Sequence, residues 1–359
     1  MSDSPGQARW QAAWLRSAQQ RGWMACLLWP VSLLYRGLIA LRRTLYTSGL
    51  FQIHRLDVPV IVVGNVIVGG AGKTPCTIAL VNHLQSQGWH PGVVSRGHGR
   101  RGTDVVHVTP DTPASNAGDE PLLIHYRTGA PVCVAARRVD AARALLAAHP
   151  QVNVLVCDDG LQHLALGRQL AVVVFDDRGV GNGGLLPAGL LREPWPPKPG
   201  EPFQPDLVLR QRRDGGPSTS VASPGAPVFD AVRRLADHAV GPQGQSMPLT
   251  RLRGQPFTAV AAIARPQVFF DMLRDQGLTP VQERALPDHA DVDAYAALLR
   301  EAVHPLICTE KDAVKLFPLL SAGPSDLPVD AWAVPLELVP DPAFFAAIDA
   351  RLAAFKPGR

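Results

Sequence analysis

The sequence predicts an α/β fold in which a mostly parallel sheet is covered by helices on both faces. Three observations support this prediction. From Val58 onward, short apolar runs alternate with helical patterns, which is typical of parallel sheets. The first apolar run leads through a glycine-rich turn into a helix, and a later run ends in two aspartates, Asp158 and Asp159. Polar groups are thereby expected at the carboxyl ends of strands, where open α/β sheets bind ligands.

The expected elements follow in chain order. Strands are predicted at residues 58–63, 91–95, 131–135, 152–156 and 170–175, and helices at 73–87, 120–126 and 139–148. A second, smaller α/β domain is predicted from strands at 258–263, 305–309 and 331–334, with helices at 266–276, from 311 onward and at 342–355. Glycine- and proline-rich stretches at 179–205 and 214–227 indicate the change of domain. We therefore expect N-terminal helices over 1–50, a core domain over 51–205, a linker over 206–230 and a second domain over 231–359.

Composition is that of a folded protein, with 359 residues, 46% hydrophobic and 18% charged. The five cysteines form no CxxC pair, which argues against a disulfide scaffold and favours a reducing compartment. Cys76 and Cys157 are expected to be small buried hydrophobic residues. The net charge of +4 is modest, and we expect no nucleic-acid partner.

The positive charge is concentrated near the N-terminus. The first 60 residues contain seven arginines against two acidic residues, and four of the seven tryptophans. Indole rings prefer the headgroup level of a membrane. Pro30 and Arg36 interrupt the apolar run of residues 24–35 before it reaches the roughly 20 residues that span a bilayer. We therefore expect neither a transmembrane helix nor a cleaved signal peptide.

The same segment predicts an amphipathic helix. One helical face carries four leucines, and two arginines lie opposite (Leu34, Leu38, Leu41 and Leu45; Arg36 and Arg43). This pattern is typical of a helix that lies on a membrane surface. The alternative is a helical hairpin that packs on the body of the protein.

A phosphate-binding loop is predicted between the first strand and its helix. The segment Gly69-Gly70-Ala71-Gly72-Lys73-Thr74 would cradle phosphate oxygens with backbone N–H groups at a helix N-terminus. Lys73 would reach the β- and γ-phosphates of ATP, and the Thr74 hydroxyl would bind Mg²⁺. The usual motif begins with glycine where this chain has Ile67, and Val68 replaces the lysine of the related ATPase switches. We assign Ile67 and Val68 to the ATP-binding loop.

The acidic pair Asp158-Asp159 is expected in the same crevice. An aspartate after a buried strand is where this fold class holds Mg²⁺. Gln162 and His163 follow on the same loop. The sequence therefore predicts an ATP-dependent kinase of the P-loop type.

Further motifs, in one order along the chain, resemble the tetraacyldisaccharide 4′-kinase family of lipid A synthesis. They span residues 10–335 and comprise Gly64-Asn65, the glycine-rich loop with Pro75, Ser95-Arg96-Gly97, Gly118-Asp119-Glu120-Pro121, Asp158 to His163, Leu191-Arg192-Glu193, Pro287-Asp288-His289 and Thr309-Glu310-Lys311-Asp312. The family commonly has an aromatic residue after Arg96-Gly97, where this chain has His98.

The resemblance implies transfer of the ATP γ-phosphate to the 4′-hydroxyl of a tetraacylated glucosamine disaccharide 1-phosphate, giving lipid IVA. It implies that Asp119 and His289 form a catalytic pair in which the aspartate takes the hydroxyl proton, and that Glu120 joins Asp158, Asp159 and Thr74 around Mg²⁺. By their residues alone, Asp119 and Glu120 equally suit a helix N-terminus. The candidate substrate-binding residues are Arg96, Arg138, Gln162, His163 and Arg192. The three arginines suit either the anionic sugar phosphate or ATP.

An acceptor with four acyl chains stays in the bilayer, so we expect the enzyme at the cytoplasmic face of the inner membrane. Two other classes remain open: a membrane-recruited P-loop ATPase switch, and a kinase for a soluble small molecule. A GTP-binding protein would need Asn-Lys-x-Asp, whereas Lys311 and Asp312 are adjacent.

Overall fold

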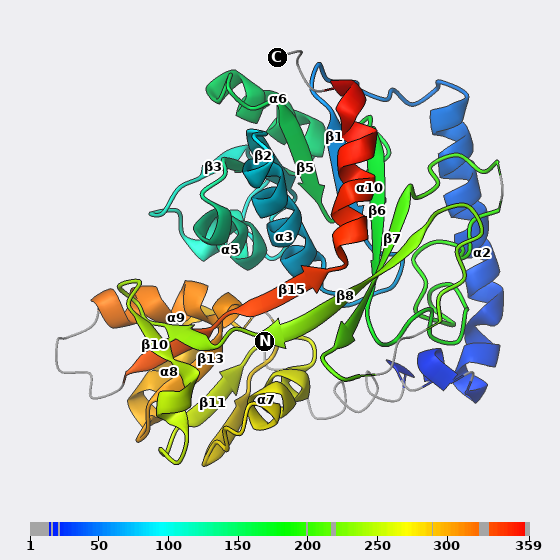
Figure 1. Ribbon diagram of the computed structural model, residues 1–359. Helices are drawn as coiled ribbons and strands as arrows, with labels where there is room; N and C mark the ends of the chain where they lie inside the picture. The colour runs from blue at the N-terminus through cyan, green and yellow to red at the C-terminus, as the bar shows by residue number, and fades with distance from the viewer. Residues whose placement is uncertain are drawn as a thin grey trace. The chain divides into compact units, whose positions relative to one another are not determined.

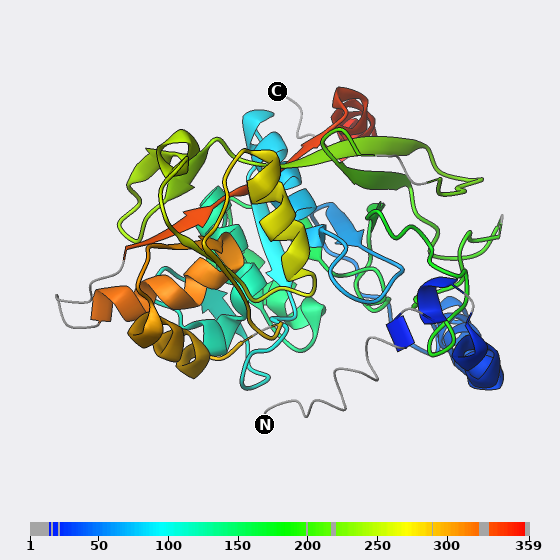
Figure 2. The same cartoon turned by 90° about the horizontal axis from the view of Figure 1, so that it is seen from below.

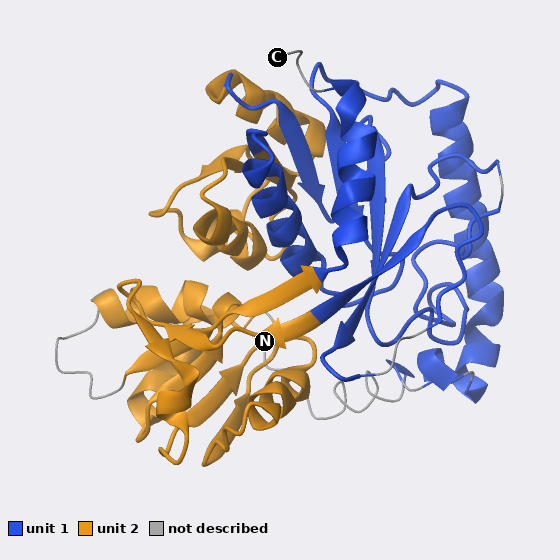
Figure 3. Cartoon of the chain, in the orientation of Figure 1, with its two compact units in different colours: residues 1–91, 150–232, 340–359 blue, residues 92–149, 233–339 orange. Residues whose placement is uncertain are grey.

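The structure, a computed structural model, describes residues 14–15, 17–20, 22–198, 200–216, 220–288, 290–322 and 330–355. It is a mixed α/β protein with two compact units (Figure 3). Unit 1 comprises residues 1–91, 150–232 and 340–359, and unit 2 comprises residues 92–149 and 233–339. The chain therefore passes between the units more than once, whereas the sequence-based domains follow one another in chain order. Each unit is described by itself below.

Unit 1 is built on a parallel sheet. Its strands β1 (Val60–Gly64), β5 (Val154–Asp158), β6 (Leu170–Phe175) and β7 (Leu207–Arg213) lie in the order β7-β6-β1-β5. All residues of β1, β5 and β6 are buried, as expected for strands covered on both faces. Val63 pairs with Asp158, so the carboxyl ends of β1 and β5 are adjacent.

Two helices of unit 1 pack together on this sheet, α3 (Lys73–Ser86) and α10 (Pro342–Leu352, continued by η2, Ala353–Phe355) (Figure 1). The His83 ring lies 3.0 Å from Asp349 Oδ1 and stacks on Phe345 with 4.2 Å between ring centroids. Because α3 begins directly after the glycine-rich loop, this packing fixes the position of the loop against the sheet.

The N-terminal helix α2 (Trp23–Thr47) is continuous through Pro30 and Arg36, the two residues that interrupt the apolar run in the sequence. Proline removes one backbone hydrogen bond, but contacts along the inner side of α2 support the helix. Ser32 Oγ donates to Leu185 O (2.9 Å), Tyr35 donates to Arg192 O (3.1 Å), and Arg43 pairs with Glu193 and Glu201. The segment between β6 and β7 accordingly lies along α2 in both views (Figures 1 and 2).

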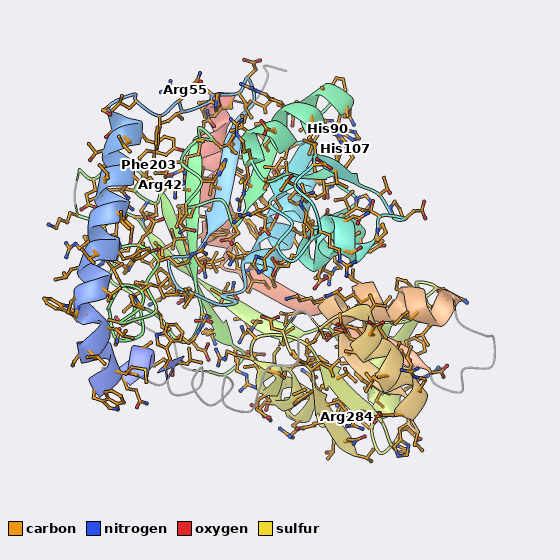
Figure 4. The ribbon with its side chains drawn as sticks, turned by 180° about the vertical axis from the view of Figure 1, so that it is seen from behind. Arg42, Arg55, His90, His107, Phe203 and Arg284 are labelled. Atoms are coloured by element: carbon orange, nitrogen blue, oxygen red, sulfur yellow. The ribbon has the colours of Figure 1, made fainter. Side chains whose placement is uncertain are left out.

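The outer side of α2 is apolar and exposed. Leu34, Leu38 and Leu41 are 72%, 64% and 57% exposed, whereas Leu45 is half-buried. Arg42, labelled in Figure 4, is also exposed. By length and composition alone, α2 is long and apolar enough to cross a membrane. The predicted leucine face is therefore present on a helix longer than the sequence suggested.

Unit 2 contains two groups of strands. In the first, β2 (Pro91–Ser95, whose first residue belongs to unit 1) pairs with β4 (Val132–Val134), which pairs with β3 (Val106–Val108). The helices here are α4 (Ala114–Ala117), α5 (Asp119–Thr128) and α6 (Arg138–Ala148). The second group has the order β10-β9-β14-β13-β11-β12, with bounds Ser246–Pro248, His238–Val240, Ala331–Val334, Leu306–Thr309, Thr258–Ala261 and Gln282–Ala285. Arg284, labelled in Figure 4, lies on the edge strand β12.

The second sheet of unit 2 is covered on both faces. Helix α7 (Pro266–Asp275) packs on the face of Ala259, Ala261 and Ile307, with η1 (Leu249–Leu252) beside it. Helices α8 (Val292–Glu301) and α9 (Glu310–Ala322) pack on the opposite face with Val260 and Cys308. Strands β8 (Val228–Leu235) and β15 (Leu336–Pro340) each contain residues of both units.

Candidate functional site

The glycine-rich loop joins β1 to α3 in unit 1. Gly69 and Gly72 have φ angles of +83° and +72°, a backbone region that side chains with a Cβ avoid. A Cβ on Gly72 would lie 2.1 Å from Gln211 Oε1, so only glycine fits there. Ile67, at the position of the usual first glycine, is wholly buried and forms an antiparallel bridge with Leu191. Its side chain thus anchors the start of the loop.

Lys73, the first residue of α3, points its ammonium group toward the acidic loop after β5. Its Nζ lies 3.3 Å from Asn65 Oδ1 and 3.5 Å from Asp159 Oδ1. One turn further along α3, Thr77 Oγ1 donates to Asp158 Oδ1 at 2.8 Å. The structure therefore brings the predicted phosphate-binding lysine and both predicted carboxylates together.

Asp159 adopts a φ of +48°, which is uncommon for a residue other than glycine and often marks a functional site. Arg192 Nη1 lies 3.2 Å from Asp159 Oδ1 and 3.1 Å from Asn65 Oδ1. Gln162 Nε2 donates to the Asn65 carbonyl at 3.1 Å. The Asp159 carboxylate thus forms ion pairs with two cations, Lys73 and Arg192, at the carboxyl ends of β1 and β5.

His163 lies on the same loop as Gln162, and its carbonyl accepts from Arg168 Nη2 at 3.3 Å. Burial lowers the pKa of the Arg168 guanidinium. Cys76 and Cys157 are buried, as predicted. Burial, and secondarily the charge of Asp158, raises the pKa of the Cys76 thiol to about 12. Cys76 is therefore a neutral thiol next to the loop, not a nucleophile.

The oxygen groups of this site suit Mg²⁺. Thr74 and Asp158 are buried, and Asp159 adjoins them in sequence. Among the residues that the structure describes, no group of three or more His, Cys, Asp or Glu side chains could hold a metal alone. Mg²⁺ commonly binds through one or two protein oxygens, several waters and substrate phosphates. The donor set therefore fits a Mg²⁺ that arrives with a nucleotide.

Sequence reasoning missed the side chains that hold the loop from behind. Asn65 Nδ2 donates to Ile67 O (2.7 Å), Arg178 donates to Val68 O (3.0 Å) and Gly70 O (3.1 Å), and Gln211 Nε2 donates to Gly72 O (2.7 Å). Asn65 was noted only as part of a motif. Arg178 and Gln211 belong to no recognisable spacing pattern.

Unit 2 contains the other predicted site residues. Asp119, the first residue of α5, is 4% exposed, and its Oδ2 lies 2.8 Å from Lys315 Nζ. The same ammonium donates to Ala290 O at 2.9 Å. Glu120 follows Asp119 and is half-buried, Arg96 is exposed, and Arg138 at the start of α6 is buried. His289 lies outside the described residues. Lys315 was not anticipated from sequence.

A glycine-rich loop between a buried parallel strand and a helix, with a lysine beside acidic residues on the neighbouring strand, defines the P-loop class of nucleotide-binding phosphotransferases. The sequence matches the family model described as tetraacyldisaccharide-1-P 4′-kinase over residues 24–353. The chain therefore belongs to the tetraacyldisaccharide 4′-kinase family. It is a kinase of lipid A biosynthesis.

Similar proteins agree with this assignment. The chain is 56% identical to a tetraacyldisaccharide 4′-kinase of Acidovorax sp. (strain JS42), covering 98% of this chain and 96% of the relative. It is 52% identical to one from Polaromonas naphthalenivorans (strain CJ2), covering 94% of each. Among solved structures, an "apo" form of LpxK from Aquifex aeolicus in complex with ATP superimposes with a TM-score of 0.75 at 26% identity, covering 91% of this chain and 99% of that one.

Proposed function

We propose that this kinase transfers the γ-phosphate of ATP to the 4′-hydroxyl of a tetraacyldisaccharide 1-phosphate, forming lipid IVA, and that the glycine-rich loop of unit 1 binds the nucleotide. One observation carries the proposal, at the carboxyl ends of β1 and β5. Lys73, at the end of the loop, and Arg192 both contact Asp159, and Thr77 on the helix that follows the loop donates to Asp158. In open α/β sheets the carboxyl ends of the strands form the ligand site.

Within this site, Lys73 exchanges its contact with Asp159 for the β- and γ-phosphates of ATP. Thr74, Asp158 and Asp159 are the residues that would hold Mg²⁺, with Glu120 as a further candidate. When bound, Mg²⁺ would offset the negative charge of the transferred phosphoryl group. Backbone N–H groups of the loop and the N-terminus of α3 provide further stabilisation of that charge.

Asp119 is the proposed general base. A buried carboxylate can accept the proton of the acceptor hydroxyl as the new O–P bond forms and the bond from the γ-phosphorus to the β–γ bridging oxygen of ATP breaks, which releases ADP. Lys315 contacts Asp119 and also the carbonyl of Ala290, the residue after His289. This shared contact supports pairing of Asp119 with His289.

Arg192 is a candidate for contact with an anionic group, because a guanidinium pairs with phosphate through two parallel hydrogen bonds. We assign Arg96 and Arg138 to the acceptor on the same chemistry. Gln162 and His163 are assigned to it because they follow Asp158-Asp159 on the same loop.

Helix α2 gives the enzyme access to a membrane-bound acceptor. Each buried CH₂ of an acyl chain contributes about 0.8 kcal/mol to membrane affinity, so a substrate with four acyl chains stays in the bilayer. The exposed apolar side of α2 is the surface that we assign to the cytoplasmic face of the inner membrane.

The test is phosphorylation of tetraacyldisaccharide 1-phosphate in detergent micelles with γ-labelled ATP and Mg²⁺. The wild-type protein should label the lipid, and Lys73→Met should lower the rate at least 100-fold because the loop loses its charge on the phosphates. Arg210→Met is a matched control, because it also replaces a cation of unit 1. Arg210 on β7 pairs with Asp230 on β8 at 2.9 Å, an ion pair that does not involve the glycine-rich loop. This variant should act like wild type.

Other outcomes identify the alternatives. Release of phosphate without labelled lipid would indicate an ATPase switch. Transfer to a water-soluble sugar, but not to the acylated disaccharide, would indicate a small-molecule kinase. Lipid labelling that survives Lys73→Met would remove the glycine-rich loop from the reaction.

A further inference from the structure

The carbonyl oxygens of the glycine-rich loop are held by side chains from neighbouring strand ends. Asp176 and Arg178 follow β6, and Gln211 lies on β7, in the strand order β7-β6-β1. Arg178 Nη1 donates to Val68 O and Nη2 to Gly70 O, while Gln211 Nε2 donates to Gly72 O. Three alternate carbonyls of the loop are therefore fixed by two residues.

The contacts to the carbonyl oxygens also fix the direction of the backbone N–H groups of the loop. In a trans peptide the C=O of one residue and the N–H of the next point in opposite directions. Fixing the carbonyls of residues 68, 70 and 72 therefore directs the N–H groups of Gly69, Ala71 and Lys73 away from Arg178 and Gln211. Backbone N–H groups that point to the same side of such a loop at a helix N-terminus can bind a phosphate anion.

The charge of Arg178 is already balanced. Its guanidinium lies 2.8 Å from Asp176 Oδ2, and the two side chains are only 9% and 2% exposed. Arg178 and Asp176 together add little net charge near the phosphates. The contribution of Arg178 is therefore geometric: its planar fork fits two carbonyls at once.

We propose that Arg178 and Gln211 are positioning residues that hold the glycine-rich loop in its phosphate-binding shape before ATP arrives. The proposal rests on the proposed function of that loop. Preorganisation of this kind raises affinity because the loop loses little conformational freedom on binding.

Steady-state kinetics of the full chain tests this role, with ATP varied at fixed lipid and lipid varied at fixed ATP. Arg178→Lys keeps the charge but loses the fork. Its KM for ATP should rise about tenfold or more, since two hydrogen bonds from a charged group are lost, and the KM for the lipid should not change. Gln211→Met, of similar volume, should raise the KM for ATP less.

A role in folding alone predicts a different result. If Arg178 and Gln211 only stabilise the fold, their variants would have a lower melting temperature and a lower apparent kcat, because part of the protein is unfolded. The KM for ATP would keep its wild-type value, and this outcome would overturn the proposal. Arg210→Met is the control on the same strand as Gln211, because it removes an ion pair that does not involve the loop. Its KM values should match the wild type.

A second variant covers the case in which Arg178→Lys does not fold. Asp176→Asn leaves the guanidinium in place but loosens it, and should give an intermediate rise in KM for ATP. Failure of the proposed function is distinguishable, because the wild-type protein would then not phosphorylate the lipid at all. An active wild-type enzyme whose variants keep the wild-type KM for ATP would refute only the positioning role.

Discussion

Lys315 is the residue of unit 2 whose contacts most directly concern the proposed chemistry. Its ammonium lies 2.8 Å from Asp119 Oδ2 and donates to Ala290 O at 2.9 Å. The side chains of Lys315 and Asp119 are nearly buried, at 11% and 6% exposed. A buried ion pair holds a carboxylate in one orientation more strictly than an exposed pair does.

We predict that Lys315→Met lowers kcat about ten- to hundredfold with little change in either KM, because the proposed base Asp119 is no longer held in place. Lys315→Arg should retain more activity. Arg274→Met removes exposed ion pairs of the same unit, with Asp271 at 2.7 Å and with Glu283, and should have little effect. Steady-state kinetics separates these cases, and equal losses in Lys315→Met and Arg274→Met would contradict the prediction.

The residues of the site differ in how far the sequence could reveal them. The loop from Gly69 to Thr74 and the pair Asp158-Asp159 carry spacing patterns that follow from phosphate and metal chemistry, and the structure brings them together. Arg178, Gln211 and Lys315 carry no such pattern. Each acts through a contact with residues more than 100 positions away, and only the tertiary structure brings these residues into contact.

Elements were predicted well where the apolar pattern is continuous. The strands at residues 170–175 and 331–334 have their predicted bounds, because buried parallel strands consist of unbroken apolar runs. The edge strand β12, with the sequence Gln-Glu-Arg-Ala, was missed. Its side chains are mostly polar, and its pairing with β11 provides the stabilisation that its composition does not.

Helix α2 runs through residues that break its apolar pattern. Pro30 leaves one backbone hydrogen bond of the helix unmade, and side-chain contacts along the helix support it. Ser32, Tyr35 and Arg43 all contact the segment between β6 and β7. The exposed leucines of the other side then remain available for a membrane.

We predict that Leu34→Glu with Leu38→Glu strongly reduces sedimentation of the protein with anionic lipid vesicles. Burial of one leucine contributes about 1.5–3 kcal/mol, and both side chains are largely exposed, so folding should be unaffected. Val303→Glu is the control, at a site of unit 2 that is 84% exposed. The result that would count against this surface is equal sedimentation of the wild type and the double variant.

Cys26 offers an independent readout of the same surface. It lies on α2 and is the exposed one of the five cysteines, the others being buried. A water-soluble maleimide should label Cys26 in free protein, and vesicles should protect it if α2 enters the lipid. Labelling that is equally fast with and without vesicles would place Cys26 outside the membrane contact.

At the scale of the whole molecule, stability depends on polar groups inside the units as well as on apolar cores. Asp312, at the start of α9, is wholly buried. Its carboxylate accepts from Tyr295 OH (2.6 Å), Thr309 Oγ1 (2.6 Å) and Ala262 N (2.9 Å). It thereby connects α8, α9 and the end of β11. In the sequence, the motif around Asp312 was part of the family resemblance and did not fit a guanine-binding signal.

Burial raises the pKa of the Asp312 carboxyl above its ordinary value of 3.8, although the hydrogen bonds from Thr309, Tyr295 and Ala262 oppose the shift. The folded protein therefore holds this proton more tightly than the unfolded chain. The contribution of this protonation to stability is complete below pH 3.8 and is lost as the pH rises through the folded-state pKa.

We predict that the urea midpoint of wild type falls relative to that of Asp312→Asn as the pH is raised from 4 to 8, because asparagine does not titrate. Asp293→Asn, an exposed change in the same unit, corrects for the general effect of removing a negative charge. Asparagine at position 312 keeps only one of the two carboxyl oxygens. Asp312→Asn therefore loses either the two hydrogen bonds from Thr309 or those from Tyr295 and Ala262, so it should be less stable than wild type at low pH. If wild type instead gained on the variant with rising pH, the hydrogen bonds would outweigh burial and the carboxylate would be the form that holds unit 2 together.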